Sequence, residues 1–373
     1  MAQQAWYKRY EEYRDEALRY IKALPNIEQN SPQIHEIRSF ERFCDIKLIF
    51  ESNTIEKAGT KTEGETREII EKYFPHISSK DPIMTNPEID IIGIATEKIK
   101  SILELELIPQ KKLLNKIIIP SITFDNVSRE FIEVLRHQVA LKLSQVMMLL
   151  FVLTRKRQSN RDFFRTKEDI VQVQEADKEL DLMLRHNKYK DRLFSQDDVL
   201  KLHQILASEL LPNDAEVEAG NYRIHDIEIV GADVKFPSPE LVPQAMKRFI
   251  DQSNTRVEQV LSGQWEEFIM VAAEVSYNFV RVHPFPDFNG RMSRLLLAMT
   301  LRAFGVPFNL ALRGSVAKYR ARYFYALKQA NHGDLKPYAT LIAMRLVESF
   351  REIDENLRLA GQRTLLELDN ETL

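Results

Sequence analysis

Two helical stripes of apolar residues, separated by a short polar loop, constrain the fold of this chain more than any other feature. Apolar side chains recur at intervals of three and four residues on both sides of residues 283–291. The first stripe comprises Phe268, Val271, Ala272, Val275, Phe279 and Val282, and the second comprises Met292, Leu295, Leu296, Met299 and Ala303. This spacing predicts two buried helices joined by a tight loop.

The composition favours helices elsewhere too, and it excludes several classes of protein. Only 11 of 373 residues are glycine, while Leu, Glu, Lys, Arg and Ala are plentiful. The formal net charge of -3 gives no global basic field, so we expect neither a nucleic-acid nor a membrane partner. Cys44 is the single cysteine, which excludes an internal disulfide and a cysteine-based zinc site. The sequence contains no apolar core of a signal peptide, and we expect a cytoplasmic protein.

Residues 1–192 are predicted to form an N-terminal helical region. Helical spacing covers about 34–50, 65–73 and 129–155, and a polar turn lies at 57–60. Between the last two helices, residues 76–126 combine prolines with β-branched clusters. An inserted subdomain and a set of long loops are equally compatible with that segment.

The pattern sharpens from residue 193 onward. Ser195 is a plausible N-cap of a helix, and residues 213–220 break the helical pattern. Ile227 and Ile229 then alternate with charged residues, and a Gly-Ala-Asp turn leads to Val234. This alternation predicts a short β-hairpin in an otherwise helical domain.

The loop between the two striped helices carries residues suited to phosphate chemistry. A helix start presents unpaired N–H groups and the positive end of the helix dipole, which favour an anion. Arg291 and Arg294 lie three residues apart there, so both can reach the same anion. Asp287 is placed to hold Mg²⁺ that bridges phosphates, and His283 is placed to accept a proton from an attacking hydroxyl.

Each of these residues also has an ordinary structural interpretation. A histidine beside proline usually packs in the structure, and an aspartate near Asn-Gly usually forms a turn or a cap. Two arginines on one helix are usually surface charges. A base, a metal carboxylate, a helix start and two guanidiniums within residues 283–294 together favour phosphoryl transfer.

The same loop resembles the signature of the Fic family, His-x-Phe-x-(Asp/Glu)-Gly-Asn-Gly-Arg-x-x-Arg. The matching residues are His283, Phe285, Asp287, Asn289, Gly290, Arg291 and Arg294. Phe288 departs from the family's glycine, and its ring either crowds the nucleotide or turns outward. The resemblance implies a mainly α fold, a Fic-type helical bundle with a short β-hairpin flap and an N-terminal helical region. It also implies a catalytic core at 193–350 and a C-terminal helical tail at 351–373.

The activity implied by this resemblance is transfer of AMP from ATP, with Mg²⁺, to a Ser, Thr or Tyr hydroxyl of a target protein or of the chain itself. His283 is then the base and Asp287 the metal ligand. The residues expected to hold the nucleotide phosphates are Asn289, Gly290, Arg291 and Arg294. The flap residues expected to dock the target chain by strand addition are Ile227, Ile229 and Val234.

A second resemblance lies near the N-terminus, in Ser52-Asn53-Thr54-Ile55-Glu56. It is similar to the inhibitory motif Ser/Thr-x-x-x-Glu-(Gly/Asn) of one Fic class, with Lys57 in place of Gly/Asn. The resemblance implies that Glu56 pairs with Arg294 and takes the place of the nucleotide's γ-phosphate. The alternative interpretation is an ordinary helix end with an exposed glutamate.

Other functions stay open at this stage. The nucleotide can differ from ATP, or Glu56 can position water that removes AMP from a modified target. A catalytically silent nucleotide- or peptide-binding module, with Phe288 blocking the site, is the alternative of another class. A P-loop NTPase is disfavoured because the sequence lacks Gly-x-x-x-x-Gly-Lys-Ser/Thr. A homodimer is also left open.

Overall fold

Helices dominate the computed structural model, which describes residues 6–24, 27, 31–73, 128–159, 192–208, 210–211, 218–228 and 234–369. The mainly α prediction is confirmed. The α-helices are α1 (Tyr10–Ala23), α2 (Pro32–Ile55), α3 (Glu63–Tyr73), α6 (Arg129–Ser159), α8 (Gln196–Ala207), α9 (Val242–Leu261), α10 (Phe268–Val282), α11 (Asn289–Ala303), α12 (Ala317–Asn331), α13 (Lys336–Leu359) and α14 (Leu365–Asp369). Short 3₁₀ turns accompany them in the described residues, η2 (Trp6–Arg9), η7 (Pro239–Leu241) and η8 (Trp265–Glu267).

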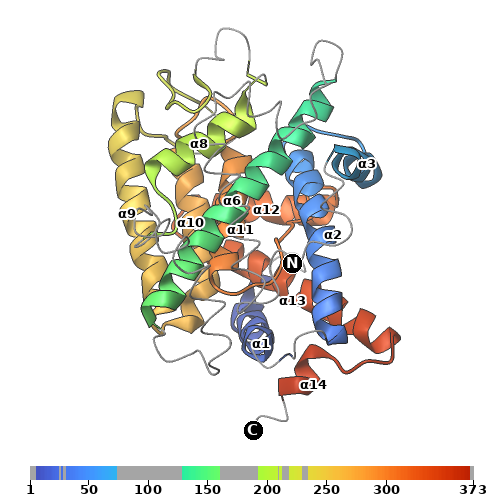
Figure 1. The fold of residues 1–373 in the computed structure, drawn as a ribbon. Coiled ribbons are helices and arrows are strands. Elements are labelled where there is room, and N and C mark those ends of the chain that lie inside the picture. The colour runs from blue at the N-terminus through green and yellow to red at the C-terminus, as the bar shows by residue number, and fades with distance from the viewer. Residues whose placement is uncertain are drawn as a thin grey trace, which may run out of the picture.

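The two helices predicted from the apolar stripes are α10 and α11, and they form the centre of the bundle. They pack against each other, and α9, α13 and α6 contact this pair from different sides. Figure 1 shows α6 running diagonally across the view between α8 and α2. Every residue of α11 except Gly290 is buried, which places the start of this helix deep in the molecule.

Helix α2 is longer than its apolar pattern predicts. Ser31 caps its start by accepting the N–H of Ile34 at 3.3 Å, and Pro32 occupies the first turn. The helix continues past the expected range of about 34–50 and ends at Ile55. The Ser52–Glu56 motif is therefore presented by the last turn of a regular helix, where residues four apart lie on the same face.

Buried polar contacts fasten α2 to the helices of the C-terminal half. Arg302 on α11 pairs with Glu41 at 2.5 Å, and Asn309 donates to Asp45 at 2.6 Å. Near the far end of α2, the N–H and hydroxyl of Ser315 both donate to Glu51, at 2.7 and 2.8 Å. These contacts hold the end of α2 in a defined position relative to α11.

The structure describes only part of the predicted β-hairpin and of the predicted domains. Residues 226–228 and 234–238 form no strand, so the predicted hairpin is not seen in the described part of its sequence, and its turn at 229–233 lies outside the described residues. The segment 76–126 also lies outside them. Helix α13 runs without a break across the predicted boundary between the core at 193–350 and the C-terminal tail at 351–373, and the domain limits stay a prediction.

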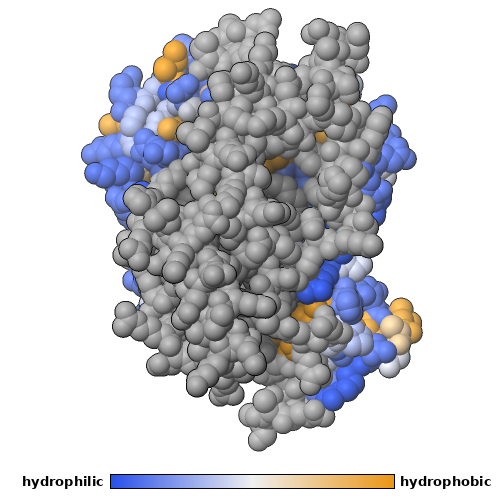
Figure 2. All heavy atoms as spheres, viewed as in Figure 1, coloured by the Kyte–Doolittle hydropathy of each residue, from blue (hydrophilic) through white to orange (hydrophobic). Residues whose placement is uncertain are grey.

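The surface and the helix lengths bear on the question of a membrane partner. Of the helices that the structure describes, none is long and apolar enough to cross a bilayer. On the face shown in Figure 2, the described side chains at the margins are mostly hydrophilic.

Two departures from the family pattern fall at residues with left-handed backbone. Lys57 has φ 57° and Phe288 has φ 63°, a region in which side chains with Cβ are strained and glycine is not. Gly or Asn at the first position, and Gly at the second, would adopt this conformation readily. The family pattern at these two positions therefore corresponds to a backbone requirement that this chain meets with other residues.

We expect Lys57→Gly to raise the free energy of unfolding by up to about 1 kcal/mol, because it removes left-handed strain from an exposed residue. Lys61→Gly is the matched control, since Lys61 is also exposed but is not among the residues with positive φ. It should leave stability unchanged or lower it. Urea unfolding of both variants would test this, and equal effects would contradict the strain argument.

Candidate active site

The signature loop is closed by its own side chains. Asn289 uses its amide twice on Phe285, accepting the Phe285 N–H at 3.0 Å and donating to its carbonyl at 2.8 Å. Phe285 is fully buried, with its ring stacked flat on His203 at 3.7 Å between centroids. The side chain of Asn289, which we predicted to bind nucleotide, thus makes two hydrogen bonds within the loop, and its contact with a phosphate stays a prediction.

His283 ends α10 in a left-handed conformation, with φ 48°. Its Nδ1 lies 3.1 Å from the carbonyl of Val280, which can only accept, so Nδ1 carries the proton and Nε2 has the free lone pair. Burial lowers the pKa of His283, and the nearby Arg223 adds to this, against the opposing effects of Glu56 and Asp287. The imidazole is therefore neutral at pH 7 and able to accept a proton.

The start of α11 has the properties of an anion site. Its N-cap residue is Phe288, and no side chain caps the helix. The first turn contains Gly290 and Arg291, whose backbone N–H groups lie at the positive end of the helix dipole. Uncapped N–H groups next to a buried guanidinium favour a bound anion.

Arg291 is 4% exposed and has an unusual set of neighbours. The carbon of its guanidinium lies 3.6 Å from the centre of the Phe288 ring, and its Nη1 lies 3.8 Å from Oε1 of Glu133. Its Nε is buried and has no hydrogen-bond partner among the described residues. Burial lowers the pKa of Arg291, partly offset by the charges of Asp287, Glu133 and Glu56. Buried donors without an acceptor are rare in proteins, and this N–H is suited to donate to an anion at the start of α11.

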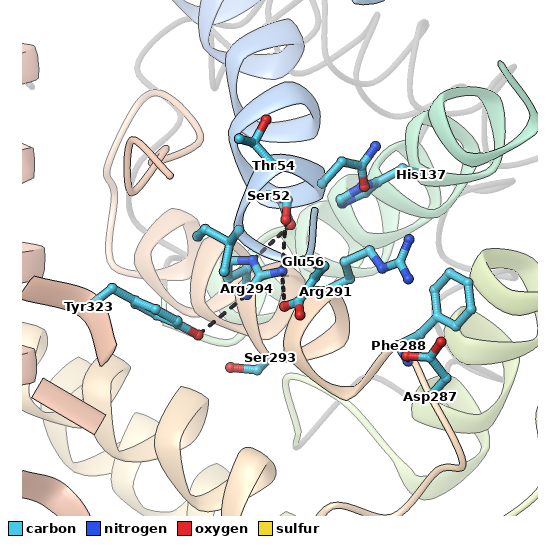
Figure 3. A network of polar contacts seen from close by, with 12 residues as sticks. Ser52, Thr54, Glu56, His137, Asp287, Phe288, Arg291, Ser293, Arg294 and Tyr323 are labelled. Carbon is cyan, nitrogen blue, oxygen red and sulfur yellow. Dashed lines mark hydrogen bonds and ion pairs between the residues drawn. The ribbon is translucent and has the colours of Figure 1, made fainter. Parts of the chain in front are cut away.

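Arg294 is fully enclosed, and every nitrogen of its guanidinium has a partner (Figure 3). Nε donates to Oγ of Ser52 at 2.8 Å, and Nη2 donates to the Ser52 carbonyl at 3.0 Å and to Glu56 Oε1 at 2.7 Å. Nη1 donates to the hydroxyl of Tyr323 at 3.3 Å. Glu56 thus balances the charge of Arg294, so this partly exposed glutamate at the end of α2 is ion-paired rather than free in solvent.

Glu56 lies at the rim of this pair, with a side chain 36% exposed. Burial alone would raise its pKa, but the charge and hydrogen bond of Arg294 outweigh this, and the pKa lies below its usual range. Glu56 also contacts the backbone of α11 closely, since a Cβ on Gly290 would lie 2.1 Å from its Oε1. Glycine at position 290 therefore leaves room for the carboxylate of Glu56.

Asp287 lies at the exposed edge of the loop. Its Oδ1 accepts the N–H of Phe288 at 2.5 Å, and its carbonyl accepts from Nε2 of His203 at 3.2 Å. A single exposed carboxylate suits Mg²⁺ that takes its other ligands from phosphates and water. Among the described residues, no group of three or more His, Cys, Asp or Glu could hold a metal without such a substrate.

The Phe288 ring turns inward rather than outward. It is 2% exposed and lies between the guanidinium of Arg291 and the edge of the His203 ring, 6.3 Å between centroids. Figure 3 shows Arg291 extending toward this ring and away from Arg294. Phe288 is therefore a platform for one of the two arginines of the signature.

Sequence reasoning missed several residues that build the site. The Arg223 guanidinium donates to the carbonyls of His283, His225 and Pro237, which ties both ends of the predicted flap to the loop. Its backbone N–H also donates to Pro284 at 2.9 Å. Glu133 and Tyr323 approach the signature arginines from distant helices. No spacing in the sequence indicated Glu133.

The predicted flap residues are only partly described. Ile227 and Val234 are half-buried, and Ile229 lies outside the described residues. The nearby Phe236 packs its ring 4.5 Å from that of His283. Their role in target docking stays a prediction.

A helical bundle with an uncapped helix start, two buried arginines and a neutral histidine defines the class of site, and comparison with known proteins agrees. Residues 193–301 match the profile of the Fic/DOC family. The chain is 33% identical over 146 residues to the protein adenylyltransferase Fic of Drosophila willistoni, covering 39% of this chain and 26% of that protein. It is 30% identical over 184 residues to the protein adenylyltransferase fic-1 of Caenorhabditis elegans, covering 48% and 33%.

Two solved structures share the fold over nearly the whole chain. Fic-1 (residues 134–508) from C. elegans superposes with a TM-score of 0.56 at 21% identity, covering 96% of this chain and 74% of that one. A Fic domain containing signaling protein from Bacteroides thetaiotaomicron gives 0.53 at 15% identity, covering 94% and 98%. Residues 193–301 are thus similar to the Fic/DOC family, and the chain spans only about a quarter to a third of the curated relatives it matches.

We expect Gly290→Ala to destabilise the protein by about 1–3 kcal/mol, because the new methyl group overlaps Glu56 Oε1. In a Glu56→Gly background this cost should disappear, since alanine is the better helix former. A double-mutant cycle on unfolding free energies would measure the coupling, about 1 kcal/mol or more. Gly64→Ala on α3 is the control, because a Cβ on Gly64 would meet only the Thr62 hydroxyl, at an ordinary 3.9 Å, and its effect should be the same in both backgrounds. A zero coupling term would contradict the contact.

The Glu56–Arg294 pair should make stability depend on pH in the acidic range. Because the pKa of Glu56 is lowered on folding, its contribution is present above the unfolded pKa and is lost as pH falls through the folded one. We expect the difference in unfolding free energy between wild type and Glu56→Gln to be constant above about pH 5.5 and to shrink below about pH 4.3. Urea unfolding at a series of pH values would measure it. A difference that persists unchanged at pH 3.5 would contradict this assignment.

Proposed function

We propose that this chain is an auto-inhibited protein adenylyltransferase that transfers AMP from ATP to a Ser, Thr or Tyr hydroxyl of a protein. The observation that carries the proposal is the buried, unpartnered Nε of Arg291 beside the uncapped start of α11. Together with Arg294, it offers positive charge and hydrogen-bond donors suited to a polyphosphate. The relatives named protein adenylyltransferase support AMP as the transferred group.

His283 is proposed to act as the general base. Its neutral ring with a free Nε2 would take the proton of the target hydroxyl as the oxygen attacks the α-phosphorus. The bond from the α-phosphorus to the bridging oxygen would break, and pyrophosphate would leave. Arg291 and the N–H groups of α11 would stabilise the charge that develops on the phosphate oxygens.

Asp287 is proposed to hold Mg²⁺, which would neutralise phosphate charge when bound with ATP. The exposed position of this carboxylate, next to Arg291 and ahead of the helix start, supports that role. The flap residues Ile227, Ile229 and Val234 are proposed to dock the target chain as an added strand.

Glu56 is proposed to inhibit the reaction by taking the acceptor position at Arg294. A carboxylate at 2.7 Å from Nη2 fills the place that a γ-phosphate oxygen would need. Its rim position, 36% exposed, leaves it a path to swing toward solvent. Glu56 is also electrostatically coupled to His283, which supports a second candidate function, removal of AMP with water positioned between these two groups.

Label transfer from α-³²P-ATP with Mg²⁺ tests the proposal. We expect little protein labelling by wild type, strong labelling by Glu56→Gly, in itself or in a lysate, and none by Glu56→Gly/His283→Ala. The histidine variant should still bind ATP, because His283 is proposed to move a proton and not to hold phosphate. Absence of nucleotide binding in Glu56→Gly would overturn the proposal. Loss of AMP from a labelled target without ATP would identify the second candidate.

A further inference from the structure

One carboxylate at the site comes from α6 and is explained neither by the signature nor by the Ser52–Glu56 motif. Glu133 lies in the second turn of α6 and is 4% exposed. Its Oε1 is 3.8 Å from Nη1 of Arg291, and its Oε2 accepts the backbone N–H of Gly59 at 2.6 Å. Glu133 thus contacts both the anion site and the turn that follows Glu56.

The surroundings of Arg291 show why its contact with Glu133 matters for anion binding. One face of the guanidinium is covered by the Phe288 ring, and its N–H groups point outward in its plane, so acceptors bind along its edges. Among the described residues, Glu133 is the carboxylate within ion-pair distance of this edge. Arg129 also reaches Glu133, at 3.2 Å, but it is 58% exposed and its charge is screened by water.

We propose that Glu133 is a second acidic group that competes with nucleotide phosphate, acting on Arg291 as Glu56 acts on Arg294. The inference rests on the proposed function, because it assigns a competitor to the same phosphate site. Each of the two signature arginines has a carboxylate from the N-terminal region, one from α2 and one from α6. The Gly59 N–H joins the two, since it belongs to the turn that directly follows Glu56.

Two electrostatic effects act in the same direction. A phosphate that binds the edge of Arg291 comes close to the Glu133 carboxylate and is repelled by it. Without that carboxylate, no described carboxylate lies within ion-pair distance of the buried Arg291, which lowers stability and favours an anion that enters. Removing the charge of Glu133 therefore tightens nucleotide binding and destabilises the nucleotide-free protein.

The test is the affinity for ATP with Mg²⁺, measured by calorimetry on Glu56→Gly and on Glu56→Gly/Glu133→Gln. Glutamine keeps an oxygen that accepts the Gly59 N–H, so the turn is retained and only the charge is lost. We expect Kd to fall about tenfold, as for the loss of one close like-charge contact in a partly screened site. The midpoint of thermal unfolding should be lower without ATP, and its rise on adding ATP should be larger.

Two further variants sharpen the test. Glu130→Gln removes the same charge from an exposed position on the same helix and should leave Kd unchanged. Glu133→Asp keeps the charge but withdraws it from Arg291, and it should lower Kd by about two- to threefold. This variant serves where Glu133→Gln does not fold.

The measured affinities distinguish a failure of the Glu133 proposal from a failure of the proposed function. If Glu56→Gly binds ATP and the Glu133 variants bind it equally or more weakly, Glu133 is only structural and the inference is overturned, while the proposed function stands. A merely structural role would lower the midpoint of unfolding without tightening Kd. If Glu56→Gly binds no nucleotide at all, the proposed function fails and the inference falls with it.

Discussion

The structure depends on the need to satisfy one fully buried cation, Arg294. A guanidinium taken out of water must find acceptors for its donors and a counter-charge, or the fold loses several kcal/mol. The partners come from two other helices, Ser52 and Glu56 at the end of α2 and Tyr323 on α12. This single residue of α11 therefore fixes where two helices distant in sequence must meet.

That arrangement also determines which part of the structure can change. Glu41, Asp45 and Glu51 fasten the body of α2 through buried contacts, whereas Glu56 sits at the partly exposed end. A ligand that offers oxygen to Arg294 has to displace only this last contact. Binding of an anion at Arg294 therefore requires breaking the Glu56–Arg294 ion pair and shifting the turn after Glu56. It does not require repacking of the whole of α2.

The sequence predicted the parts of the site that are encoded locally. Apolar spacing located α10 and α11, and the motif in the loop between them located His283, Asp287 and both arginines, because neighbours on a helix are set by its period. The pairing of Glu56 with Arg294 followed only from the resemblance. Glu133 could not be predicted at all, because a lone glutamate on a charged helix carries no signal of which distant helix it will face.

The two departures from the family pattern are best understood through the backbone. Lys57 and Phe288 both hold left-handed φ values that glycine would adopt without strain, so the loop geometry persists although the residues differ. At Lys57 the side chain is exposed, so burial does not offset this strain. At Phe288 the ring is buried against Arg291 and His203, and apolar burial with a cation–π contact of this kind outweighs a strain of about 1–2 kcal/mol. The contacts of the aromatic ring thus offset the backbone strain at position 288. Because the ring covers one face of Arg291, the edge of the guanidinium is the part that contacts Glu133 and would contact a phosphate.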